Sequence, residues 1–167
     1  MFCFMINMNT AELVKIFRTA YDTALPKPLH DFIADEQFKG MDGKFITVEG
    51  KKYRLRFLSD MLNRMGGLVD QAIRVAISDR TGGEPIGFFE ALPGDDDYFH
   101  EIAVVPRHRE NRLDENDPLP VYLISFRGYP VDFDEDEHED LEEEEDTFEF
   151  HIRKISASFE QFLKLVP

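Results

Sequence analysis

The sequence predicts an α+β fold in a single domain, with a central mixed or antiparallel sheet flanked by N-terminal helices and a C-terminal helix. The chain has 167 residues, a usual length for one domain. Apolar residues recur at helical spacing near both ends of the chain, and short alternating apolar segments fill the middle. Helices at the ends with strands between them are typical of this fold class.

The N-terminal region predicts two helices. Residues 10–23, TAELVKIFRTAYDT, place their apolar side chains on one helical face. In the next segment, LPKPLHDFIADEQF, the prolines suit the start of a short second helix. Asn9 and Glu12 form a capping box directly after Met8. Residues 1–8 are therefore expected to be a disordered end or to precede a true start at Met8.

The middle of the chain predicts strands. Residues 44–58, KFITVEGKKYRLRFL, predict a β-hairpin that turns at Glu49 and Gly50. Ser59 is positioned to cap a helical turn that ends at the glycines of residues 66–67. The segments AIRVAIS and FHEIAVV predict two further strands, separated by the turn residues of DRTGGEPIG. RHRENRLDENDPLP, residues 107–120, predicts a polar loop.

The C-terminal third predicts two strands and a closing helix. VYLISF, residues 121–126, predicts a central strand, and TFEFHIRKI, residues 147–155, predicts a second one. SASFEQFLKLV predicts a helix with Ser158 and Gln161 as its capping box. The two strands are expected to pair as a hairpin, so the segment between them is an insertion and not a tail.

This insertion, predicted as an acidic loop over residues 132–146, holds nearly all of the net charge. Thirteen of the 18 residues from 132 to 149 are Asp or Glu, and none is Lys or Arg. The formal charge is −15, yet outside this segment 21 acidic residues stand against 19 basic ones. Long loops are usually functional or disordered, and acidic runs also serve solubility alone. The sequence alone leaves both a functional loop and a segment that serves only solubility open as interpretations.

The composition narrows the class of protein. The chain is 43% hydrophobic with 16 Phe, which argues against a wholly disordered polypeptide. Cys3 is the only cysteine, so no internal disulfide can form, which favours a reducing compartment. No apolar run approaches the roughly 20 residues that a membrane-spanning helix needs. The sequence predicts a cytoplasmic protein without membrane association.

A metal-binding site is the most specific alternative interpretation of the acidic insertion. With Asp132 as the first position, carboxylates fall at the third, fifth, ninth and twelfth positions of a calcium-binding EF-hand loop. Those residues are Asp134, Asp136, Asp140 and Glu143. Glu137 stands where the loop needs glycine, and so many acids produce such a match by chance. In GDDDYFHE, His100 is read as a strand residue after a turn and not as a metal ligand.

No motif indicates catalysis or a cofactor. The chain lacks a Gly-x-Ser-x-Gly elbow, and RTGGEPIG has neither the Lys nor the spacing of a phosphate-binding loop. Direct nucleic-acid binding is disfavoured because it depends mostly on Lys and Arg that neutralise phosphates. The sequence predicts a protein that is not an enzyme and that needs no cofactor.

A dense row of carboxylates predicts instead a basic protein partner, because it presents negative charge much as a phosphate backbone does. Such fields raise association toward roughly 10⁸–10⁹ M⁻¹s⁻¹ at low salt. The predicted partner-binding residues are Asp134, Glu135, Asp136, Glu137, Glu139, Asp140, Glu142, Glu143, Glu144, Glu145 and Asp146. Asp95, Asp96 and Asp97 are predicted as a second patch.

The C-terminal third resembles the SUKH superfamily of Smi/Knr-like proteins. Its members commonly end with a strand that leads into a Ser-Phe-x-x-Phe-Leu helix. The matching residues here are Ser158, Phe159, Phe162 and Leu163. Leu25 and Pro26 fit the family's Leu-Pro start of a short helix, and Gly40 and Gly43 fit its glycine-bearing turn. The resemblance covers residues 121–166 best and the rest of the chain loosely.

The resemblance implies one α+β domain over residues 1–167 that binds a partner without catalysis. The superfamily includes bacterial immunity proteins that neutralise cognate toxins, often nucleases, as well as cell-wall regulators and translocon-associated proteins. The leading expectation is an immunity protein that occludes a basic, nuclease-type toxin by stoichiometric binding. A regulatory or secretion-associated adaptor of the same fold is the alternative, and a calcium-binding module is a lesser one.

Overall fold

The computed structural model describes residues 10–59, 67–92, 98–109, 112–114, 116–128, 130 and 148–166. The helices are α1 (Thr10–Tyr21), α2 (Lys27–Ala34), the 3-10 helix η2 (Gln37–Gly40), α3 (Gln71–Thr81) and α4 (Phe159–Leu163). The strands are β1 (Phe45–Val48), β2 (Lys51–Phe57), β3 (Ile86–Leu92), β4 (Phe99–Val104), β5 (His108–Arg109), β6 (Arg112–Leu113), β7 (Val121–Arg127) and β8 (Glu149–Ser156). The predicted α+β class is confirmed.

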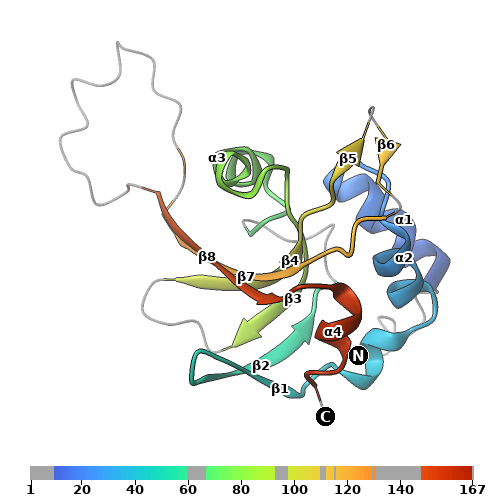
Figure 1. The fold of residues 1–167 in the computed structure, drawn as a ribbon, viewed down its shortest axis with the longest axis horizontal. Helices are drawn as coiled ribbons and strands as arrows, with labels where there is room; N and C mark the ends of the chain where they lie inside the picture. The colour runs from blue at the N-terminus through green and yellow to red at the C-terminus, as the bar shows by residue number, and fades with distance from the viewer. Residues whose placement is uncertain are drawn as a thin grey trace, which may run out of the picture.

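Six strands form one curled antiparallel sheet in the order β1-β2-β3-β4-β7-β8. Strands that follow one another in the sequence are therefore neighbours in space, and β1 and β8 form the two edges. Figure 1 shows α1, α2 and α4 gathered on one side of the sheet, with α3 apart from them. Across the hollow of the sheet, Arg153 of β8 forms an ion pair with Glu49 of the first hairpin, with Nη1 and Oε1 3.4 Å apart.

The core beneath α1, α2 and α4 is built largely from phenylalanine. Phe32 of α2 meets the rings of Phe89 and Phe159 edge-on, with centroids 6.0 and 5.4 Å apart. Phe17 of α1 stacks on Phe57 of β2 at 5.6 Å. Aromatic pairs in these geometries add about 0.5–1.5 kcal/mol beyond their buried area. The predicted first two helices and the first hairpin are confirmed.

The prediction that AIRVAIS forms a strand is wrong, because these residues belong to α3. Asp70 begins this helix, since its side chain accepts hydrogen bonds from the backbone N–H groups of Ala72 and Ile73. Gly82 ends it in the left-handed conformation, with a φ of 82°. The buried Ile73 and Ile77 lie four residues apart, which places them on one helical face.

Strand β3 was not predicted, because its sequence IGFFEAL does not alternate. A register shift between Gly87 and Phe89 puts a bulge in its pairing with β4. Phe88 and Phe89 are both fully buried, and both contact Phe32. Strands buried on both faces read as continuous apolar runs, so alternation fails as a signal here. The predicted polar loop over residues 107–120 also contains the short pair β5–β6.

The C-terminal predictions are confirmed. Strands β7 and β8 pair along their length, and β7 lies inside the sheet between β4 and β8. The hydroxyl of Ser158 accepts a hydrogen bond from the backbone N–H of Gln161, and the Gln161 side chain accepts one from the backbone N–H of Ala157. Phe159 and Phe162 of α4 are buried in the core, as expected.

Several predictions fall outside the described residues. These are the N-terminal segment 1–8, the helical turn after Ser59, the Asp95–Asp97 patch and the acidic loop over residues 132–146. Among the helices that the structure describes, none has the length and apolar character needed to cross a bilayer.

Candidate partner-binding end of the sheet and a polar cleft

Three connections leave the sheet at the same end. The antiparallel register opposes Arg54 to Leu92 and Phe99 to Phe126, so the start of β2, the end of β3, the start of β4 and the end of β7 lie together. The connections are the β1–β2 turn, residues 93–98 and residues 128–148. We call this region the loop end of the sheet.

The loop end brings together the points from which both predicted acidic segments leave the sheet. Residues 93–97 follow β3, and residues 131–147 lie between β7 and β8. The last pair of the β7–β8 ladder joins Arg127 to Glu149, so the strands before and after the acidic insertion are still paired at these two residues. None of the predicted partner-binding residues belongs to the described part of the chain.

One face of the loop end is aromatic. Phe99, Phe126 and Phe150 are opposite one another on β4, β7 and β8, so their side chains share this face. Phe148 lies 5.5 Å from Phe150 between ring centroids. The guanidinium of Arg80, from the last turn of α3, lies 5.4 Å from the Phe150 ring centroid. Phe99 is 57% exposed, whereas Phe126 is buried.

The opposite face of the loop end is polar. Arg127 donates two hydrogen bonds to the carboxylate of Glu149, at 3.2 and 3.1 Å, and its guanidinium lies over the Tyr98 ring. The Tyr98 hydroxyl donates a hydrogen bond of 2.9 Å to the same carboxylate. The Arg127 and Tyr98 hydrogen bonds hold the pKa of Glu149 below its usual range. The Glu149 carboxylate therefore stays ionised in neutral solution, and the cluster joins the end of β7 to the start of β8.

Deeper on the same face, His100 and Ser125 form a buried pair. His100 Nδ1 and Ser125 Oγ are 2.5 Å apart, and Arg153 Nη2 donates to the same Oγ at 3.1 Å. Burial, with smaller effects from the charges of Lys51 and Arg153, lowers the pKa of His100 from 6.5 to about 4. The imidazole is therefore neutral near pH 7, and its hydrogen bond with the serine hydroxyl joins two uncharged groups.

This Ser–His contact has the hydrogen bond of a nucleophile and its base, but it lacks access. Ser125 is 1% exposed and His100 is 5% exposed. His100 also meets the Tyr53 ring edge-on at 5.3 Å, which leaves no room for a substrate at that side. Together with Arg153, the pair joins β4, β7 and β8, and we interpret it as a structural contact. His100 is a strand residue, as expected from the sequence.

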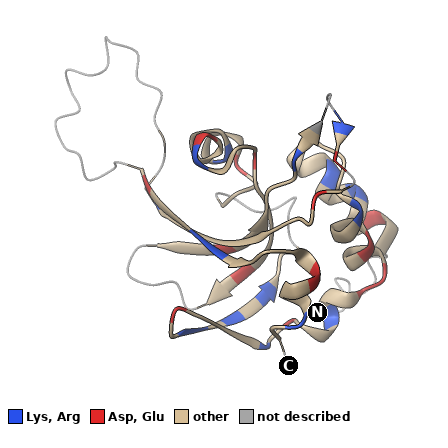
Figure 2. Cartoon of the chain, viewed as in Figure 1, with Lys and Arg blue, Asp and Glu red and all other residues tan. Residues whose placement is uncertain are grey.

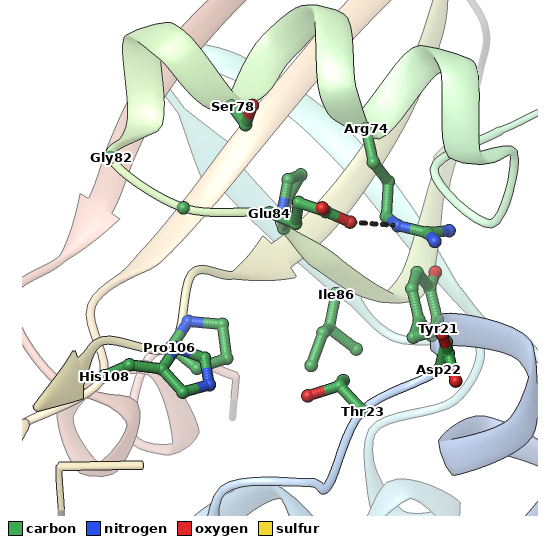
Figure 3. A pocket seen from close by; sticks show the side chains of 12 residues that line it. Tyr21, Asp22, Thr23, Arg74, Ser78, Gly82, Glu84, Ile86, Pro106 and His108 are labelled. Atoms are coloured by element: carbon green, nitrogen blue, oxygen red, sulfur yellow. Dashed lines mark hydrogen bonds and ion pairs between the residues drawn. The ribbon is translucent and has the colours of Figure 1, made fainter. Parts of the chain in front are cut away.

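A second feature is a polar cleft of about 490 Å³ between α1, α3 and the start of β3. Figure 3 shows Tyr21, Arg74, Glu84 and His108 around it. Arg74 Nε donates to Glu84 Oε1 at 3.1 Å, and Nη1 donates to the carbonyl oxygens of Leu68 and Val69. The guanidinium carbon lies 5.0 Å from the Tyr21 ring centroid.

A buried polar network extends from the floor of this cleft. The Tyr21 hydroxyl donates to the carbonyl of Gly87 at 3.0 Å and accepts from its N–H at 3.1 Å. Glu101, which is fully buried, accepts from the N–H of Leu68 at 3.1 Å through Oε2. A Cβ at Gly87 would clash with Glu101 Oε1, so only glycine at this position leaves room for the Glu101 carboxylate. The network fastens α1 and the start of α3 to β3 and β4.

The cleft is better suited to bracing the fold than to catalysis. The positive charge of Arg74 is already paired with Glu84 and wrapped by backbone carbonyls, so it is not presented to a ligand. Among the described residues, no cluster of three or more His, Cys, Asp or Glu is arranged to hold a metal ion. Sequence reasoning missed Arg74 and Glu101, because it placed Arg74 on a strand and because β-sheet register cannot be read from one chain.

Comparisons with known proteins give no match: no family model, no curated protein and no solved structure is significantly similar to this chain. The resemblance to the SUKH superfamily therefore stays a prediction from the residues quoted above.

Proposed function

We propose that this protein is a non-catalytic binding protein that neutralises a basic, nuclease-type toxin by stoichiometric binding, as immunity proteins of the SUKH superfamily do. One observation carries the proposal. The register of β3, β4, β7 and β8 makes both acidic segments of the sequence leave the sheet at the loop end. Two acidic segments at one end of a sheet present a single field to a cationic partner.

The acidic insertion is attached in a way that suits this role. The strands before and after it, β7 and β8, are paired and joined by the Arg127–Glu149 ion pair, while the described body contains both signs of charge (Figure 2). Association steered by exposed charge is fast at low salt and is screened beyond about 8 Å at physiological ionic strength. Binding is therefore expected to lose speed steeply as salt is added.

The test uses a purified basic nuclease domain encoded beside this gene, with association followed by stopped-flow fluorescence at two salt concentrations. Changing Glu142–Glu145 to glutamine should slow association by about tenfold or more at low salt. A matched variant changes four exposed carboxylates elsewhere, namely Glu12→Gln, Asp35→Asn, Asp79→Asn and Glu160→Gln. It removes the same charge, so a similar loss of rate in both variants would show that net charge acts without the insertion.

Two results would contradict the proposal. An association rate that does not change in the Glu142–Glu145 variant removes the insertion from the mechanism. A complex that forms at the same rate but leaves the nuclease fully active shows binding without neutralisation, which favours the regulatory adaptor.

A further inference from the structure

The first strand of the sheet borders a groove. Within the described chain β1 pairs only with β2, so alternate backbone N–H and C=O groups of its four residues face outward. A groove of about 710 Å³ lies against this strand, lined by residues 43–47, Lys52 and Leu165. A groove beside an unpaired strand edge is the geometry in which an extended peptide adds to a sheet.

The groove has apolar walls. Phe45 of β1 is 48% exposed and Leu165, just after α4, is 47% exposed. They are two of the four large hydrophobic side chains that stand exposed on the described surface, and both line this groove. Apolar side chains gathered beside a strand edge are suited to contact alternate side chains of an added strand.

Basic residues frame the same edge. The register opposes Phe45 to Arg54 and Thr47 to Lys52, so these two cations share the face that carries Phe45. Figure 2 shows the blue segments of the β1–β2 hairpin. Edge strands that avoid pairing with another chain often carry lysine or proline. Strand β1 has the sequence FITV and carries no charge. Lys52 and Arg54, which lie on β2, therefore favour an acidic strand beside β1 and leave the β1 backbone open to pairing.

We propose that the β1 edge is a docking site for an extended segment of another protein that carries acidic and apolar residues in turn at every second position, so that both kinds share one face. The segment adds a strand beside β1, its apolar side chains contact Phe45 and Leu165, and its carboxylates meet Lys52 and Arg54. This site selects a partner of opposite charge to the one that the acidic insertion attracts. It goes beyond the proposed function and does not depend on it.

The probe, called the Glu–Val peptide, is a labelled peptide of sequence Glu-Thr-Val-Thr-Glu-Thr-Val-Thr, in which Glu and Val share one face of the strand. It is titrated with the full chain and followed by fluorescence anisotropy. Two control peptides separate the contributions. One has Lys in place of Glu, and the other has proline in place of alternate residues, which removes backbone N–H donors. The Glu–Val peptide is expected to bind, and both controls are expected to bind at least about tenfold more weakly.

Variants then locate the site. Lys52→Glu and Phe45→Ser should each weaken the Glu–Val peptide by about tenfold, since few contacts hold so short a segment. Lys154→Glu on β8, the other edge of the sheet, is the matched charge control and should change affinity by less than about twofold. Leu165→Ser repeats the test of the apolar wall if Phe45→Ser does not fold. Equal weakening by Lys52→Glu and Lys154→Glu would overturn the proposal, because it shows attraction by charge alone.

A chain that lacks residues 2–8 tests a competing occupant. If the peptide binds only after this deletion, the apolar N-terminal segment of the chain itself is the occupant of the edge, and the proposal is overturned. If neither chain binds the Glu–Val peptide, it is overturned as well. Binding to both chains with the same variant effects supports it.

Discussion

His100 is a buried histidine that lies beside one aromatic ring and near two cations. Lys51 and Arg153 lie near it, the Tyr53 ring covers one side, and Nδ1 is hydrogen-bonded to Ser125 Oγ. A proton on this imidazole is opposed by burial first and by the two cations second, which is why its pKa falls to about 4. The unfolded chain, with an ordinary histidine pKa near 6.5, binds more protons between these values. Stability contributed by neutral His100 is thus complete above pH 6.5 and is lost as pH falls toward 4.

His100→Asn should flatten the acid side of the stability profile, because asparagine keeps an amide that can hydrogen-bond near the position of Nδ1 but does not titrate. Between pH 7 and pH 4.5, the native chain should lose about 1–3 kcal/mol more unfolding free energy than the variant. Urea titrations at the two pH values measure this difference. His108→Gln on β5, which removes an exposed histidine, is the control and should keep the acid-side loss of the native chain. Parallel profiles for the native chain and His100→Asn would contradict the assignment.

Strand β3 meets strand β4, α1 and the segment before α3 at a point that tolerates no extra atom. Gly87 lies against the buried Glu101, and its backbone is bonded on both sides to the Tyr21 hydroxyl. Glu101 is held by the N–H of Leu68, so it cannot move aside without breaking that hydrogen bond. The contacts among α1, β3, β4 and the segment before α3 therefore require a residue without a side chain at position 87.

Gly87→Ala should lower the free energy of unfolding by about 1–3 kcal/mol, because overpacking displaces a fully buried carboxylate. Thermal and urea unfolding measure the loss. Gly40→Ala is the matched control, since a Cβ there meets nothing within 4 Å. It should stay within about 0.5 kcal/mol of the native chain or gain slightly through a less flexible unfolded state. If both variants unfold alike, Glu101 is free to move and the network does not brace the sheet.

The elements that could be predicted are those whose local pattern agrees with their tertiary setting. The hairpin of β1 and β2 alternates because one face is core, and α4 has its Ser158 cap beside two buried phenylalanines. In α3, residues 73, 75 and 77 alternate like a strand, yet Val75 is 50% exposed and only the two isoleucines face the core. The cap at Asp70 and the glycine at 82 were the signals that would have identified the helix.

The candidate site was predictable only in part. Pairing of the strands on either side of the acidic insertion followed from two apolar segments, and β7 and β8 confirm it. The meeting of His100, Ser125 and Arg153 could not be foreseen, because it depends on register across three strands. The basic edge of β1 also needed the structure, since a sequence does not tell which strand is left unpaired.

The charge of the molecule is divided between a mixed body and one acidic insertion. The formal charge of −15 arises almost wholly from residues 132–149, whereas the described strands and helices carry ion pairs such as Arg127–Glu149 and Arg153–Glu49. A body that folds through its own core does not need the insertion for stability. High net charge of one sign, in contrast, repels itself and opposes compaction.

Replacing residues 129–147 with Asn-Gly-Asn should therefore keep the fold and stabilise it. The loop between the paired Arg127 and Glu149 shrinks from 21 residues to five, about two halvings, which lowers the closure cost by about 1 kcal/mol. Loss of self-repulsion acts in the same direction at low salt. Urea unfolding at low and high salt measures the gain, and association with the basic nuclease domain should slow as it does in the Glu142–Glu145 variant. A loss of several kcal/mol would instead mean that the acidic residues bind the body's own lysines and arginines, and the proposed attraction to a basic partner would fail with it.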